Sequence, residues 1–437
     1  MYNKYSAWEQ YAGMSAIIPN NLRLTTVRWE KTKSWNLGFN LNFLEDLICI
    51  NFNVYEKRTS DLLQSGVKIP SSVGFSSLDY ENVGTMKNDG WDVYVYTKPI
   101  MKVGKFSMKL KFNAAQNRNR VTSMDASVLS GLNDDFDYLN TDQRVANGKP
   151  GYLSRVQVGN ALYSIYGFRY KGVYRYDYDH SGYFADDAKN ALYGDNTAAA
   201  AAARGEVATT PVARDANCNI IFDAEGNPLR MFFNYGGTNY RFAGGDAIYE
   251  DINHDGQINE LDIVYLGNSN PKFNGGFGID LMYGRWTLKT SFNIRTGAKI
   301  VNMARMNAEN MRSNNNQSRA VNWRWRKNGD LTEIPRAMNT NAGVSYNALA
   351  SDRYVEPCDF IRLQYMQLSY TFDNKVLKRM GLGLKALSFA CSANNLFFFT
   401  KYSGVDPEHS ASGYNPAYDS SQTPRSRSIT FSLNFSF

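Results

Sequence analysis

The sequence predicts an all-β fold, in which antiparallel strands form the wall of a transmembrane β-barrel that carries long loops at one end. Three observations predict it. Several segments alternate between apolar and polar residues, as strands do when one face meets lipid and the other meets water. Aromatic residues make up 14% of a chain whose mean hydropathy is -0.46, which is typical of aromatic girdles around a wet interior. The connections are short at one end of these segments and long at the other.

The first hairpin is expected over residues 34–54. Its apolar positions are Trp35, Leu37, Phe39, Leu41 and Phe43 in one run, then Ile48, Ile50, Phe52 and Val54 in the next. A short turn at Glu45 and Asp46 separates the runs, and mostly polar residues such as Asn36 and Asn40 fill the alternate positions. The pattern predicts two strands that share one apolar face.

Two further hairpins are expected over residues 91–113 and 277–295. Their apolar positions are Trp91, Val93, Val95, Phe106, Met108, Leu110 and Phe112 in one, and Phe277, Ile279, Leu281, Tyr283, Trp286, Leu288, Phe292 and Ile294 in the other. The opposite faces carry charged residues, among them Lys109, Lys111 and Lys289. Full charges on one face indicate that this face is wet.

The segment from 361 to 372 changes phase. Ile361 and Leu363 are out of register with Met366 and Leu368, which predicts a β-bulge between the two runs. The last ten residues alternate without error. Their apolar positions, which resemble the carboxyl-terminal assembly signal of outer-membrane barrels, are Ile429, Phe431, Leu433, Phe435 and Phe437. For this segment alone, an amphipathic last strand of a soluble sheet is the alternative.

The connections differ in length. Short turns are expected at 44–46, 100–105 and 284–285, and long excursions at 120–160, 175–272 and 298–358. Short periplasmic turns with long external loops are the asymmetry of outer-membrane barrels. Within the excursions, the low-complexity segment 198–203 is interpreted as a helical turn or a tolerated insertion, and 303–312 is expected to be helical. No linker or internal repeat divides the chain, so residues 1–437 are taken as one barrel unit.

Charge and motifs exclude several function classes. The net charge of +7 is spread along the chain, so nucleic acid is not indicated, and the basic residues around Trp323 and Trp325 are interpreted as a packed loop. No apolar stretch is long enough for a membrane helix. The four cysteines fit no metal spacing, and no catalytic motif is present, so we predict no catalytic residues and no enzyme.

One motif points to a metal. Residues 251–262 place oxygen-bearing residues at positions 1, 3, 5, 7 and 12 of a loop with glycine at position 6, as in EF-hand loops, which bind Ca²⁺. The predicted ligands are Asp251, Asn253, Asp255, Gln257 through its carbonyl, and Asp262. Asp rather than Glu at position 12 resembles dockerin loops, and flanking helices are not evident. Such a loop would have a structural role within an external excursion; the alternative is a solvated acidic turn.

Four motifs taken together resemble the carboxyl-terminal part of SusC/RagA-type TonB-dependent outer-membrane transporters. They are Val27–Gly38, the 251–262 loop followed by Leu266–Gly276, Asn395–Phe397 and Tyr402–Glu408. The resemblance covers about residue 22 to the end. It implies a 22-stranded barrel with a plugged lumen in the outer membrane of a Gram-negative bacterium. It also implies import of oligosaccharides or peptides, energised by the TonB complex and capped by a SusD-like surface lipoprotein.

The sequence departs from that family in one respect. It shows no plug, no TonB-contacting segment and no signal peptide, all of which the family carries amino-terminally. About half the expected strands are present, and a half-barrel has two unpaired edges, which are costly in hydrocarbon. We therefore expect a piece of a transporter. The alternatives are a non-functional truncated transporter, a calcium-dependent surface glycan-binding β-protein, and a passive pore. The sequence does not identify ligand-contacting residues.

Overall fold

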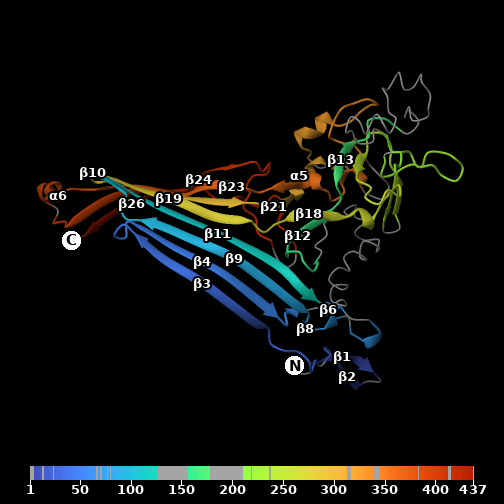
Figure 1. Cartoon of the computed structure of the whole chain (residues 1–437), viewed down its shortest axis with the longest axis horizontal. Helices are drawn as coiled ribbons and strands as arrows, with labels where there is room; N and C mark the ends of the chain where they lie inside the picture. The colour runs from blue at the N-terminus through green and yellow to red at the C-terminus, as the bar shows by residue number, and fades with distance from the viewer. Residues whose placement is uncertain are drawn as a thin grey trace.

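The computed structural model describes residues 4–436 except for several gaps. The gaps are 12–13, 23, 65–66, 69–70, 76, 79, 126–155, 178–209, 218, 236–237, 313–315, 339–344, 382 and 412–414. The low-complexity segment 198–203 and the terminal Phe437 lie outside the described residues. Long strands form one part of the molecule, and a body of loops and short strands lies at one end of them (Figure 1).

The long strands form one antiparallel sheet, here called the wall sheet. Its order is β26-β24-β23-β20-β19-β11-β9-β4-β3, with β10 paired to β11. The strands are β3 (Lys31–Phe43), β4 (Ile48–Ser60), β9 (Gly84–Thr97), β10 (Met101–Val103), β11 (Phe106–Met124), β19 (Phe273–Tyr283), β20 (Trp286–Thr296), β23 (Phe360–Thr371), β24 (Ala386–Thr400) and β26 (Ser428–Ser436). Among the described residues the sheet is open, because β3 and β26 each pair with one neighbour.

The predicted hairpins are confirmed in register. Phe39 pairs with Phe52 in the first hairpin, and Phe277 pairs with Phe292 in the third. The predicted bulge is confirmed too, since the register between β23 and β24 shifts between Leu363 and Tyr365. The 100–105 segment is more than a turn, because it contains β10, which forms a tight hairpin with the start of β11.

The two faces of the wall sheet differ as predicted. The outward face carries exposed apolar side chains: Phe431 is 69% exposed and Leu433 58% exposed. The opposite face holds polar contacts, such as Lys111 Nζ to Asp280 Oδ2 at 2.9 Å and Asn53 Nδ2 to Asp92 Oδ2 at 2.9 Å. A sheet that exposes its apolar face and pairs its charges on the other face is suited to lipid outside and water inside.

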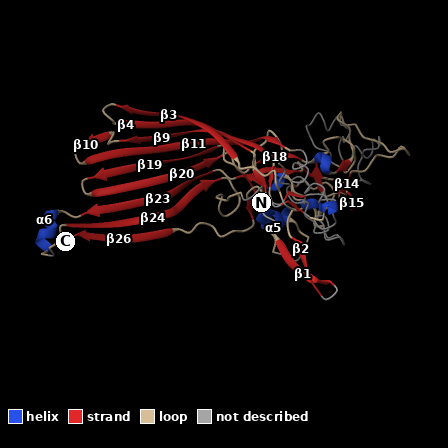
Figure 2. Cartoon of the chain, turned by 90° about the horizontal axis from the view of Figure 1, so that it is seen from below, coloured by secondary structure: helices blue, strands red, loops and turns tan. Residues whose placement is uncertain are grey.

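Tight connections lie at one end of the wall sheet and the long excursions at the other (Figure 2). The tight end has the turn between β3 and β4, the turn at Gly284 and the short helix α6 (Asn374–Met380). Asp373 caps this helix by accepting a hydrogen bond from Lys375 N at 2.9 Å. The carboxyl terminus lies at this end. The predicted asymmetry of the connections is therefore confirmed for the described residues.

The excursions fold into short elements, which we call the loop body. Its strands are β12 (Ser164–Gly167), β13 (Tyr170–Val173), β14 (Phe232–Tyr235), β15 (Thr238–Arg241), β16 (Ala247–Tyr249), β17 (Gln257–Ile258), β18 (Val264–Asn268), β21 (Lys299–Asn302), β22 (Val355–Pro357) and β25 (Tyr418–Asp419). Its helical turns are α5 (Met303–Glu309), η4 (Glu260–Asp262), η5 (Arg319–Trp323), η6 (Tyr346–Ala348) and η7 (Asp352–Tyr354). The helix expected over 303–312 is shorter, because it ends at Glu309.

Smaller elements lie towards the amino terminus. They are β1 (Tyr5–Tyr11), β2 (Met14–Pro19), β5 (Leu63–Gln64), β6 (Val67–Lys68), η1 (Ser71–Val73), β7 (Ser77–Leu78) and β8 (Glu81–Asn82). The large apolar core lies in the loop body, where Tyr166, Phe168, Phe233 and Phe242 are among its buried residues. No helix among the described residues is both long and apolar enough to span a membrane.

Candidate functional site

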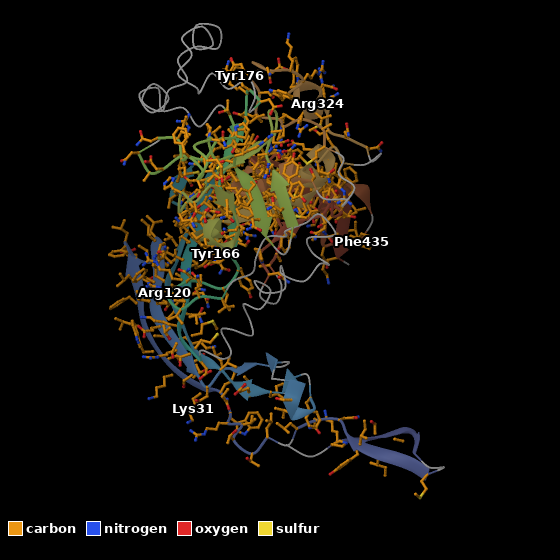
Figure 3. All side chains as sticks on the ribbon, turned by 90° about the vertical axis from the view of Figure 1, so that its right-hand side faces the viewer. Lys31, Arg120, Tyr166, Tyr176, Arg324 and Phe435 are labelled. Carbon is orange, nitrogen blue, oxygen red and sulfur yellow. The ribbon has the colours of Figure 1, made fainter. Side chains whose placement is uncertain are left out.

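The loop body is held by aromatic packing. Tyr240 stacks on Tyr346 with ring centroids 4.2 Å apart, and Phe233 lies 5.4 Å from Tyr346. Phe233 is 1% exposed. Figure 3 shows Tyr166 on the same densely packed body. These contacts place Phe233 inside the core, and the partly buried Tyr240 packs against it, so both residues help to hold the loop body together.

A buried carboxylate joins distant segments of this body. Asp246 is fully buried and accepts hydrogen bonds from Arg336 Nε at 2.7 Å, from the Tyr240 hydroxyl at 2.7 Å and from Ala243 N at 2.8 Å. The pKa of the Tyr240 hydroxyl is raised. Desolvation by burial is the larger cause, and the nearby Asp246 charge is the next. The network fixes the strands that precede the candidate calcium loop.

The candidate calcium loop runs from β16 to η4. At its start Asp251 accepts hydrogen bonds from Gly256 N at 2.8 Å and from Asp255 N at 3.2 Å. Gly256 has a φ of +81°. A Cβ atom there would lie 2.8 Å from the Leu229 side chain and 2.9 Å from that of Ala213, so glycine is required for both conformation and space.

The end of the loop is closed by Asp262, whose side chain is fully buried. Its carboxylate accepts hydrogen bonds from Ile252 N at 2.7 Å and from Asn259 N at 2.9 Å. Burial raises the pKa of Asp262 to about 6, and burial likewise raises the pKa of Asp251. Desolvated carboxylates whose charge is disfavoured are groups that a bound cation would stabilise.

The remaining predicted ligands lie at the rim of this loop. Asp255 accepts from Gln257 N at 2.8 Å and from Asn253 Nδ2 at 2.9 Å. Gln257 begins β17, which pairs in parallel with β14. The donor chemistry and the glycine therefore fit a hard cation. In this conformation, however, the carboxylates engage backbone amides, and the described residues contain no group of three or more His, Cys, Asp or Glu side chains placed to hold a metal.

The predicted assembly segment forms the edge strand β26. It pairs with β24 so that Phe431 lies opposite Cys391 and Leu433 opposite Phe389. Ile429 and Phe435 are also exposed on the outward face. Four of the five residues of the segment thus share one exposed apolar face.

The two tryptophans of the basic cluster lie in different environments. Trp325 donates from Nε1 to Arg175 O at 3.1 Å and packs against Gly245, whereas Trp323 is 75% exposed. The prediction of a packed loop is therefore confirmed for Trp325, whereas the Trp323 side chain faces solvent.

A buried ion pair was not predicted from the sequence. Arg362 on β23 is 2% exposed and donates from Nη2 to Asp406 Oδ1 at 2.6 Å. Asp406 also accepts from Glu408 N at 2.9 Å and from Arg425 N at 3.1 Å. This pair anchors the 401–427 loop to the wall sheet. Asp406 lies within the Tyr402–Glu408 motif, but alternation alone did not show which wall residue it meets.

Comparisons with known proteins agree on one family, although no family model matches the chain. TonB-dependent receptor P39 of Formosa agariphila is 29% identical over 443 residues, covering 98% of this chain and 37% of the receptor. TonB-dependent receptor SusC of Bacteroides thetaiotaomicron is 31% identical over 156 residues, covering 36% of this chain and 14% of SusC. The chain is a relative of the SusC/RagA-type TonB-dependent transporters.

The solved structures agree in fold. The RagAB peptide transporter matches with a TM-score of 0.63 and 19% identity, covering 100% of this chain and 38% of that chain. The chain thus has the fold of the barrel wall in TonB-dependent transporters. It spans 37% and 36% of the lengths of two curated receptors of Formosa agariphila. The relatives are receptors and transporters, which agrees with the prediction that the chain is not an enzyme.

Proposed function

We propose that this chain supplies wall strands and external loops to an importer in the outer membrane of a Gram-negative bacterium. The observation that carries the proposal is the two-faced wall sheet, apolar and exposed outside, polar and ion-paired inside, with its loop body at one end. Active import would draw on the TonB complex through a region outside this chain. The names of the relatives support this assignment.

The cargo of this importer is proposed as oligosaccharides, with peptides as the other class. The second class is supported by the RagAB peptide transporter, whose fold is similar. A SusD-like surface lipoprotein is the proposed partner at the loop body, because the long excursions gather at that end of the wall sheet. Outer-membrane lipid would contact the exposed apolar face.

An immunoblot of outer membranes tests the proposed importer. Membranes from the source cell, probed with an antibody to the 219–231 loop, are run with and without boiling. We expect a band well above 49.4 kDa that shifts on boiling, because a closed barrel resists SDS and the relatives are longer than this chain.

A band at 49.4 kDa that does not shift on boiling would contradict import, since two open edges are not stable in hydrocarbon. Recovery of the chain in the fraction extracted without detergent would instead favour a surface glycan-binding protein.

We further propose that the candidate calcium loop binds Ca²⁺ in a structural role. The support is the ligand spacing, the Gly256 backbone and the two desolvated carboxylates, Asp251 and Asp262. Extracellular calcium modules bind with a Kd of about 10⁻⁴ to 10⁻³ M. At a calcium concentration ten times Kd, the local opening equilibrium should fall about tenfold.

Limited proteolysis of the membrane-embedded protein, with calcium or with EDTA, measures this protection. Asp251→Asn and Asp262→Asn should abolish the calcium effect. Asp223→Asn is the matched control, because Asp223 also accepts a backbone hydrogen bond within an acidic turn, from Asn227 N at 2.7 Å. Equal protection by magnesium, or none up to about ten times the upper Kd of this range, would identify the loop as a solvated turn.

A further inference from the structure

A cavity of about 700 Å³ lies where the wall sheet meets the loop body. Its origin is a difference in strand length. Strand β11 pairs with β19 from Phe106 to Ala115, then continues to Met124 with β9 as its partner in the wall sheet. Beyond Ala115, the edge of β11 that faced β19 no longer pairs with that strand. Residues Gln116 to Arg120 border the cavity there. Figure 3 shows Arg120 on this strand, beside the body that carries Tyr166.

The cavity is lined by cations without carboxylates. Its lining contains Arg118, Arg120, Lys272 and Lys299, and no Asp or Glu. Lys299 donates from Nζ to Leu266 O at 2.6 Å, and a side chain at Gly267 would collide with the stem of Lys299. Among the described residues, the other three cations have no ion-pair partner, unlike Lys111 lower on β11, which pairs with Asp280. Arg118 and Arg120 are exposed, and unpaired positive charge along the lining of one cavity favours an anionic ligand.

The position of two of these cations relative to the apolar face suggests the source of that ligand. Side chains two residues apart on a strand share a face, so Arg118 and Arg120 lie on the same face as Phe112 and Ala114. Four residues of strand separate Ala114 from Arg118, which is about 13 Å along the strand. Cations just beyond an apolar belt lie at the depth of lipid headgroups.

Neutral contacts shape the same cavity. Gln116 is oriented by Trp91, whose Nε1 donates to Gln116 Oε1 at 3.0 Å. Asn270 donates from Nδ2 to Leu162 O at 3.2 Å, and Asn160 donates to the Tyr166 hydroxyl at 2.8 Å. Because these side-chain amides are hydrogen-bonded within the protein, their positions are fixed. The cations without an ion-pair partner are therefore the groups that would bind a ligand.

We propose that this cavity binds the phosphate of an outer-leaflet glycolipid through Arg118, Arg120 and Lys272. The proposal rests on the outer-membrane placement proposed above. A phosphate monoester carries up to two negative charges and several acceptor oxygens, so it matches guanidinium and ammonium donors. The lipid chains would lie on the apolar face below Arg118. A free phosphate would use the same donors without that apolar contact.

Native mass spectrometry of the protein, extracted from outer membranes with a mild detergent, tests the proposal. Purified monophosphoryl lipid A, its dephosphorylated form and inorganic phosphate are the added probes. We expect retention of the phosphorylated lipid, at least tenfold weaker retention of the dephosphorylated one, and no competition by inorganic phosphate at equal concentration. The triple variant Arg118→Gln, Arg120→Gln, Lys272→Gln should lose retention at least tenfold.

Matched controls separate this site from general charge effects. The triple variant Lys102→Gln, Lys105→Gln, Lys378→Gln removes the same charge at the opposite end of the wall sheet and should retain the lipid. If the first triple variant does not fold, Lys272→Gln alone should weaken retention about threefold. Equal retention of both lipids, unchanged retention in the cavity variants, or full competition by inorganic phosphate would overturn the proposal. The heat-modifiable band reports separately on the proposed importer.

Discussion

Phe431→Arg should strongly reduce the folded, heat-modifiable form of the protein. Phe431 lies at the middle of β26, is 69% exposed on the apolar face and stacks near Phe389 with ring centroids 6.2 Å apart. An arginine that faces lipid near the bilayer midplane costs about 2 to 4 kcal/mol. The fraction of folded barrel after urea titration in lipid vesicles, read from gel mobility without boiling, measures that loss.

Ser432→Arg is the control for Phe431→Arg. Ser432 is the next residue on the same strand and points to the polar face, where it pairs with Ala390. The same added charge there should change the free energy of unfolding by less than about 1 kcal/mol, because lumen-facing positions remain hydrated. If the two variants lose stability equally, the assignment of the two faces is wrong.

Asp406→Ala should destabilise the anchored 401–427 loop by about 3 to 5 kcal/mol. The substitution removes the nearer ion-pair partner of Arg362, which is 2% exposed and packs with its guanidinium 4.8 Å from the Phe398 ring. The buried Arg362 charge keeps only the longer contact from its Nε to Glu408 Oε2 at 3.5 Å, and the amides of Glu408 and Arg425 lose their acceptor. Hydrogen exchange of the 401–411 backbone, measured by mass spectrometry, should show at least hundredfold faster exchange.

Two variants test whether the loss of close pairing for the buried Arg362 charge causes that destabilisation. Arg362→Met combined with Asp406→Leu removes both charges and should recover a large part of the protection, because an apolar pair often replaces a buried ion pair at little cost. Arg425→Ala cuts the exposed pair between Arg425 and Glu408 and should cost less than about 1 kcal/mol. Equal losses in the single and double variants would show that packing, rather than charge, anchors the loop.

The wall could be predicted from the sequence because alternation is a local signal. Each of the apolar runs that begin at Trp35, Phe106 and Phe277 became one strand with the expected face, and the phase change after Leu363 became a bulge. The predicted ends of the strands were less accurate. β11 continues to Met124 because it keeps β9 as a partner, a long-range pairing that periodicity does not contain.

The candidate sites were predicted only in part, because the sequence shows local spacing but not contacts between distant residues. The calcium loop is contiguous, so the spacing of Asp251, Asp255 and Asp262 could be read directly. Its burial depends on distant residues such as Leu229, which the motif does not contain. The Arg362–Asp406 pair and the cationic cavity join residues far apart in sequence, and their meeting depends on register and strand length. Calcium and ligand binding at these places stay predictions.

The pairing of β11 with β19, here called the seam, is expected to form late in the assembly of the wall sheet. The described residues between Met124 and Phe273 belong mostly to the loop body, whereas β3 joins β4, and β19 joins β20, through tight turns. Loop-closure entropy rises with the logarithm of loop length, so pairs with short connections should form first and the seam should close late. The β3–β4 and β19–β20 hairpins would then form early, whereas the β11–β19 and β20–β23 pairs, which both close over long excursions, would form late. The order in which the wall strands pair would therefore depend on how quickly the loop body folds.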